Sequence, residues 1–202
     1  LTNAPQLVIA LNNLAYLYLE KLNKPDQAYD FARRARQLVP DEPSVADTFG
    51  WAQYHRKEYA QALVTLSEAA AKLPREPEAQ FHLGMAHYQN GNETEAANAL
   101  GRALTLSTSF SGASEAQRRL QLLSELSQPV SGENVAKRKA LLEKQNDDPI
   151  ALNHLAKIQL NEGDRTSAKN SLERLVTLTP RSVPTLLTLA RLNAADNPRR
   201  SL

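Results

Sequence analysis

The feature that most constrains the fold of this chain is a repeat of 34 residues. Alanine, glycine, proline and tyrosine all recur at this spacing in the first half of the chain. The coincident sets are Ala28, Ala62 and Ala96; Ala35, Ala69 and Ala103; Gly50 and Gly84; Pro40 and Pro74; Pro43 and Pro77; and Tyr54 and Tyr88. A fixed period of this length indicates a stack of similar supersecondary units, each of which buries its apolar face against its neighbours.

The composition indicates that each unit is a pair of helices. Leucine and alanine number 32 and 29, whereas valine and isoleucine together number only 11, and this ratio favours helix because β-branched residues lose more side-chain freedom there. In the unit that begins at Pro43, we predict a first helix to about Arg56 and a turn near Lys57-Glu58. A second helix then runs to about Lys72, and Pro74 ends it because proline cannot continue a helix.

The glycines of the repeat have two predicted roles. Gly50 and Gly84 lie in the middle of first helices, where glycine costs about 1 kcal/mol relative to alanine. Together with the alanines of the second helices, they would let helix backbones approach closely. Gly91 and Gly163 fall at turns, where the chain leaving a helix favours a residue with positive φ.

These residues carry a family resemblance. The segment VADTFGWAQYHRKEYAQALVTLSEAAAKLP resembles the tetratricopeptide repeat, which has a small residue at its eighth position, alanine at the twentieth and twenty-seventh, and proline at the thirty-second. Gly50, Ala62, Ala69 and Pro74 match that pattern. The resemblance implies an all-α fold, a right-handed superhelical solenoid of antiparallel helix pairs with about five to six repeats, one of them degenerate. It also suggests a fragment of a larger bacterial repeat protein.

The repeat changes phase between Ala96 and Ala168, because their separation of 72 residues exceeds two periods by four. The extra residues are predicted within residues 127–133, a segment rich in proline, glycine and serine. One interpretation is a loop insertion in a continuous array. The other ends a first array of three regular repeats with a capping helix near residues 113–126. We expect segments 1–128 and 129–202, the second containing one regular repeat and one truncated repeat.

The sequence contains no recognisable catalytic motif. It has no cysteine, no phosphate-binding glycine loop, no nucleophile elbow and no metal-ligand spacing among its four histidines. We therefore predict no enzyme activity, catalytic residue, cofactor or metal site. The net charge is +2 without a basic block, which argues against nucleic-acid binding, and no apolar run is long enough for membrane insertion. A cytoplasmic location and a bacterial periplasm or cell-envelope location both remain open.

The resemblance implies where a partner would bind. In tetratricopeptide arrays the first helix of each repeat lines a concave groove, and aromatic side chains are enriched among residues that dominate binding energy. A structural role, in which the aromatics pack between neighbouring helices, is an equal alternative for Tyr54 and Tyr88. The predicted groove residues are Asn12, Tyr16, Asp47, Trp51, Tyr54, His55, Phe81, Met85, Tyr88 and Gln89.

The predicted function is therefore a non-catalytic scaffold that binds a partner peptide or helix in its concave groove, largely through residues before about Leu126. The alternative is an accessory or assembly region of a larger enzyme or export machine, such as bacterial exopolysaccharide export. Self-association through an exposed repeat end is a further possibility. Asn12, Tyr16, Asp47 and Trp51 stand where some family members carry the lysine and asparagine of a carboxylate clamp, so the chaperone binding of those members is not expected.

Overall fold

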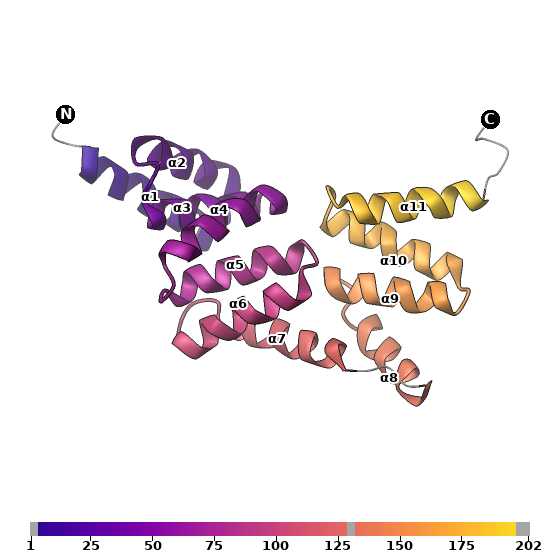
Figure 1. Cartoon of the computed structure of the whole chain (residues 1–202). Coiled ribbons are helices and arrows are strands. Elements are labelled where there is room, and N and C mark those ends of the chain that lie inside the picture. Colours follow the sequence, from indigo (N-terminus) through magenta and orange to yellow (C-terminus); the bar gives the residue numbers. More distant parts are fainter. Residues whose placement is uncertain (1–3, 129–131, 197–202) are drawn as a thin grey trace. The chain divides into compact units, whose positions relative to one another are not determined.

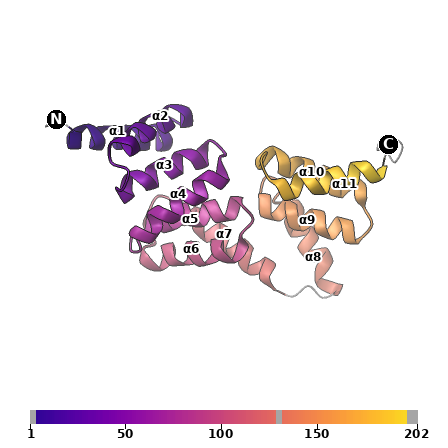
Figure 2. The ribbon, with the colours of Figure 1, turned by 45° about the horizontal axis from the view of Figure 1, so that its top comes forward.

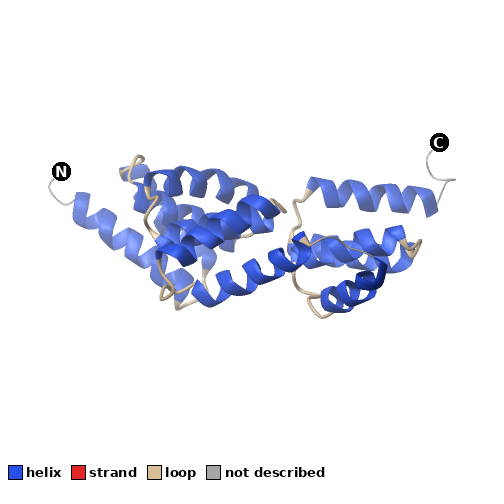
Figure 3. Ribbon diagram, turned by 60° about the horizontal axis from the view of Figure 1, so that its bottom comes forward, coloured by secondary structure: helices blue, strands red, loops and turns tan. Residues whose placement is uncertain are grey.

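The computed structural model describes residues 4–128 and 132–196, which form eleven α-helices and no strand (Figures 1 and 3). The structure divides into two compact units, Leu1–Ser127 and Gln128–Leu202, and each unit is described by itself. The helices of the first unit are α1 (Ala4–Glu20), α2 (Pro25–Leu38), α3 (Pro43–His55), α4 (Tyr59–Lys72), α5 (Pro77–Gln89), α6 (Glu93–Leu106) and α7 (Ala113–Ser127). Those of the second unit are α8 (Gly132–Glu143), α9 (Pro149–Asn161), α10 (Arg165–Leu178) and α11 (Val183–Asp196).

The first unit is a stack of three antiparallel helix pairs followed by a single helix (Figure 2). The pairs are α1 with α2, α3 with α4, and α5 with α6, and the second helix of each pair also packs against the next first helix. The final helix, α7, packs on α6 and reaches α5. The predicted helix–turn–helix unit is confirmed, with a first helix that ends one residue earlier than expected.

The turns within the helix pairs repeat one backbone conformation. Gly91 and Gly163 have φ values of 75° and 79°, which confirms the prediction that these turns need a left-handed residue. Asn23 and Lys57 adopt φ values of 49° and 60° at the same place in the first two pairs. Proline opens the helices α2, α3, α5 and α9, where its missing N–H costs no hydrogen bond.

Small residues bring the two helices of each pair together, as predicted. A Cβ atom added to Gly50 would lie 2.7 Å from the Leu66 Cγ, and one added to Gly84 would lie 2.7 Å from the Leu100 Cγ. Both leucines are fully buried, so they have little room to move. The repeated alanines of the second helices are also fully buried: Ala28, Ala35, Ala62, Ala69, Ala96 and Ala103.

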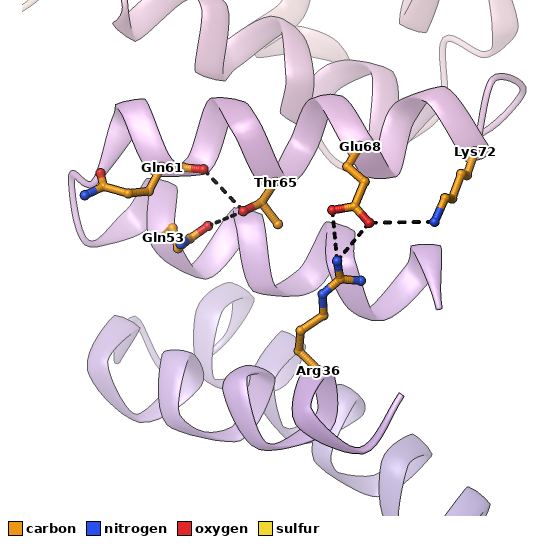
Figure 4. A network of polar contacts seen from close by, with 6 residues as sticks. All are labelled: Arg36, Gln53, Gln61, Thr65, Glu68 and Lys72. Carbon is orange, nitrogen blue, oxygen red and sulfur yellow. Dashed lines mark hydrogen bonds and ion pairs between the residues drawn. The ribbon is translucent and has the colours of Figure 1, made fainter. Parts of the chain in front are cut away.

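Polar contacts tie together the outer surfaces of three successive helices (Figure 4). The Arg36 Nη2 atom of α2 donates to both carboxylate oxygens of Glu68 on α4 at 2.9 Å, and Lys72 lies 3.6 Å from the same carboxylate. The Thr65 hydroxyl donates to the Gln53 side-chain oxygen at 2.9 Å, which joins α4 to α3. Arg36 holds the pKa of Glu68 below its usual value. These surface contacts join neighbouring helices but add little to the stability of the fold, because exposed ion pairs contribute about 0.2–1 kcal/mol each.

The second unit has an aliphatic core in which leucine and alanine predominate and Ile150 is also buried. Leu152 and Ala156 of α9, Leu172 and Leu175 of α10, and Leu192 of α11 form its buried cluster. No aromatic residue occurs after Phe110 in the sequence. The Asp148 and Asp164 carboxylates accept hydrogen bonds from the backbone N–H groups of Ala151 and Ser167 and so cap α9 and α10.

Of the segment predicted to contain the phase shift, residues 129–131 lie outside the described residues. The two interpretations of that shift therefore stay open. Among the described helices, none combines the length and the apolar character that crossing a bilayer requires.

Candidate functional site

The first helices of the three pairs meet through a stack of rings centred on Trp51. The indole lies between Tyr54 of the same helix, with ring centroids 4.5 Å apart, and His82 of α5, with centroids 4.1 Å apart, and both contacts are nearly parallel. His55 approaches the indole edge-on at 4.7 Å. The indole N–H donates to the Glu20 carboxylate of α1 at 3.2 Å. Side chains of α1, α3 and α5 therefore form one surface, the α1–α3–α5 face, and both faces of the Trp51 ring are covered.

The part of this face that belongs to α5 is covered by the chain that follows α6. Phe81 packs against Phe110, with ring centroids 5.5 Å apart, and Gly112 lies directly against the Phe81 ring. The Arg119 guanidinium of α7 lies 4.9 Å from the centroid of the Tyr88 ring, and Tyr88 is fully buried. Burial raises the pKa of Tyr88 well above its usual value.

The α1 end of the face is open. Tyr16 is 39% exposed, and Ile9, two helical turns earlier on the same side, is 60% exposed. The pKa of Tyr16 is raised by its partial burial and by the carboxylates of Glu78 and Glu20. Tyr16 is thus the aromatic side chain of this face that solvent, and hence a ligand, can reach most readily.

Carboxylates dominate the polar groups of the face. One oxygen of Asp47 lies 2.9 Å from the His82 Nδ1, while its other oxygen is buried without a hydrogen-bond partner. The Asn12 side-chain oxygen and the His55 Nε2 atom are likewise buried without a partner. Among the described residues, Glu78 makes no hydrogen bond or ion pair. The face therefore has spare hydrogen-bond acceptors and little positive charge.

The ten predicted groove residues fall into three groups according to how exposed their side chains are. Tyr16 is exposed, and Asn12, Asp47, Tyr54, His55 and Gln89 are partly buried. Trp51, Phe81, Met85 and Tyr88 are buried. The Gln89 amide donates to the Tyr54 hydroxyl at 3.3 Å, and burial raises the Tyr54 pKa well above its usual value. The buried members form the floor of the face, and their role in binding stays a prediction.

Sequence reasoning missed His82 and Gly112 as parts of the site. The pairing of His82 with Asp47 joins residues 35 positions apart, one repeat plus one residue. Because Asp47 and His82 lie on first helices of neighbouring repeats, their sequence positions could have indicated that the two side chains meet. Phe110 is the last aromatic residue of the sequence. Its position alone did not indicate that it would pack on Phe81.

Two partly buried histidines, His55 and His87, predict a pH dependence of stability. Burial lowers the pKa of His55 and of His87 below the usual value of ~6.5, with Glu20 and Glu95 opposing the shifts. A histidine with a lowered folded pKa contributes stability above its unfolded pKa and loses that contribution as pH falls toward the folded value. The first unit should therefore lose stability between pH 7.5 and 5.5.

The measurement is the urea midpoint at both pH values for the wild type and for His55→Gln. The midpoint of the wild type should fall more than that of the variant. An equal fall in the two proteins would show that His55 does not contribute, and His154→Gln in the second unit is the control.

Comparisons with known proteins agree with the fold. Family models described as the tetratricopeptide repeat match residues 48–113 and residues 150–182. A curated relative, a TPR repeat-containing protein of Pseudomonas aeruginosa, is 31% identical over 80 residues, or 40% of this chain. The chain covers only 13% of that relative's length.

Solved structures show the same arrangement of helices. The pilF protein of Pseudomonas aeruginosa matches with a TM-score of 0.52 and 20% identity, over 98% of this chain and 87% of that one. The first TPR domain of Spaghetti (RPAP3), bound to the HSP90 peptide SRMEEVD, matches with a TM-score of 0.52 and 23% identity, over 60% of this chain and 93% of that one. YrrB, a TPR protein with an unusual peptide-binding site, matches with a TM-score of 0.50 and 17% identity, over 90% of this chain and 91% of that one. At these identities the likeness establishes the fold alone.

Proposed function

Because this chain is a tetratricopeptide repeat protein, we propose that it is a non-catalytic scaffold that binds a partner peptide or helix on its α1–α3–α5 face. The observation that carries the proposal is the exposed Tyr16 and Ile9 beside a rigid floor of stacked rings. An exposed aromatic over a packed floor provides contact area with little loss of side-chain freedom on binding. The peptide bound by Spaghetti and the peptide-binding site of YrrB support the same use of this fold.

The proposal assigns binding to the first unit. The aromatic side chains of the α1–α3–α5 face, which include Tyr16, Trp51 and Phe81, belong to this unit, whereas no aromatic residue follows Phe110 in the sequence. We propose that segment 1–128 binds and that segment 129–202 extends or positions the array. The relative is much longer than the matched part, so the role as an accessory region of a larger enzyme or export machine stays a second proposal. A catalytic motif elsewhere in the full open reading frame would favour it.

The test of the proposed function is Tyr16→Ala. Tyrosine anchors contribute about 2 kcal/mol or more to interfaces, which corresponds to roughly a 30-fold loss of affinity. The loss should appear in isothermal titration with peptides selected from a random 12-residue display library, while the melting temperature stays unchanged. Val64→Ala, which shortens an exposed side chain on α4, is the matched control. Equal affinities for the two variants would place binding outside this face.

Self-association has a structural candidate in α1. Leu14 and Leu17 are exposed, although Ala52 and Ala86, the equivalents of Leu17 in α3 and α5, are fully buried against a preceding second helix. We propose that this uncovered stripe joins copies of the chain at high concentration. The molar mass from light scattering should rise with concentration, and Leu14→Gln with Leu17→Gln should remove the rise. A wild-type mass that stays monomeric throughout would exclude self-association.

A further inference from the structure

The open end of the α1–α3–α5 face is negatively charged. Glu20 of α1, Asp47 of α3 and Glu78 of α5 all lie on it, and the carboxylates of Glu20 and Glu78 both act on Tyr16. The His82 ring contacts this group through Asp47, whose carboxylate lies 2.9 Å from its Nδ1 atom. Among the described residues, no lysine or arginine forms an ion pair with any of these three carboxylates. The whole chain has a net charge of +2, so the negative charge is a local property of this face.

The same end has more acceptors than donors. Glu20 accepts from the Trp51 indole, but Glu78 has no donor among the described residues. The buried oxygens of Asn12 and Asp47 also lack donors. A buried acceptor without a partner is unfavourable, so a donor that reaches this group removes that unfavourable state as well as adding attraction.

Exposed apolar atoms adjoin the charges. The Tyr16 ring and the Ile9 side chain can cover the methylene groups of a long side chain, and the Tyr16 ring can accept a cation on its face. A lysine or arginine side chain combines these properties, because it has an apolar stem and ends in three or five N–H donors.

From these observations we propose that the α1–α3–α5 face recognises a basic side chain, a lysine or arginine that follows or precedes an apolar residue in the partner segment. This inference rests on the proposed function and names the chemistry of its ligand. The apolar residue packs on Ile9 and Tyr16. The cation lies between Glu20 and Glu78, where it can donate to both carboxylates.

The proposal also states what the face rejects. An acidic segment or a free carboxyl terminus would bring negative charge onto three carboxylates, and like charges at an interface weaken binding and slow association. Attraction between charges that remain partly exposed is screened by salt. Affinity for the basic segment should therefore fall as the salt concentration rises.

The experiment uses the full chain and a library of randomised 12-residue peptides with one position fixed as Lys, Arg, Glu or Leu. Bound peptides are quantified at 50 and 300 mM NaCl. The test variant is Glu20→Gln with Glu78→Gln, which keeps an acceptor for the Trp51 indole. The matched control is Glu173→Gln on α10, which removes the same kind of charge from the second unit.

The expected result is enrichment of the Lys and Arg libraries over the Glu library by roughly tenfold at 50 mM salt, with a smaller ratio at 300 mM. The double variant should lose the preference for basic residues and still bind the Leu library, while the control keeps the preference. Binding without preference for charge, or with preference for Glu, overturns this inference and leaves the scaffold function standing. No binding by any of the four libraries overturns both.

Discussion

Leu100→Ala is expected to lower the free energy of unfolding of the first unit by about 2–5 kcal/mol, the range for leucines whose removal leaves a cavity. Leu100 is fully buried between the helices of the third pair, where it lies against the bare Cα of Gly84. Equilibrium urea denaturation followed by the fluorescence of Trp51, which lies in the first unit, measures the change. Leu106→Ala is the control, because Leu106 is exposed on the same helix and surface changes cost within about 0.5 kcal/mol.

Gly84→Ala and Leu100→Ala should be strongly coupled. Alone, Gly84→Ala forces its Cβ to 2.7 Å from Leu100 and 3.0 Å from the Leu100 backbone nitrogen. Overpacking of this kind costs about 1–3 kcal/mol, and the gain in helix propensity offsets about 1 kcal/mol of that cost. In the Leu100→Ala background the clash with the Leu100 side chain is gone and the approach to the backbone nitrogen of residue 100 remains, so Gly84→Ala should cost less there than in the wild type.

Gly101→Ala provides a matched control for the glycine change. Gly101 lies in α6, and a Cβ atom added there meets nothing within 4 Å, so the variant should gain about 0.5–1 kcal/mol. If Gly84→Ala stabilised the wild-type chain as Gly101→Ala does, the close approach of the two helices would not be a constraint on sequence.

Trp51→Ala is expected to destabilise the first unit by about 3–5 kcal/mol, the range for buried aromatic residues. The indole is 6% exposed and lies between Tyr54 and His82, so its removal leaves a cavity where α1, α3 and α5 meet. Trp51→Phe should lose less, since it keeps much of the ring contact and gives up the hydrogen bond to Glu20. Urea denaturation of the wild type, Trp51→Phe and Trp51→Ala should rank their stabilities in that order, from highest to lowest.

The contrast between Trp51 and Tyr16 separates packing from binding. Tyr16→Ala should lose affinity and keep its stability, whereas Trp51→Ala should lose stability first. A Trp51→Ala protein as stable as the wild type, with weakened peptide binding, would contradict the packing role and make the indole a direct contact for the ligand.

The repeat register made most of the fold predictable. The spacing of Gly50, Gly84 and the repeated alanines requires helices at fixed separations, because larger side chains at those places would clash. Gly91 and Gly163 correctly predicted turns with a left-handed residue. Asn23 and Lys57 adopt the same conformation without glycine, and this could not be predicted because neither residue type requires a positive φ.

Exposure on the candidate face could not be predicted in the same way. Register places Trp51 and Met85 at the positions equivalent to Tyr16, with Phe81 and Tyr88 one turn before and after Met85 on α5. Whether such a side chain faces solvent depends on what covers it, and Phe110, Gly112 and Arg119 cover the α5 positions. Those contacts come from residues 110–119, which follow the third helix pair and lie where the 34-residue pattern of matching residues no longer continues.

The restriction of aromatic side chains to the first unit has a spectroscopic consequence. Trp51 is the single tryptophan of the chain, and no tyrosine or phenylalanine follows Phe110. Tryptophan emission and near-ultraviolet dichroism therefore report on the first unit alone, whereas far-ultraviolet dichroism reports on helices of both. Overlaying the two denaturation curves of one unlabelled sample measures whether the units unfold together or one at a time.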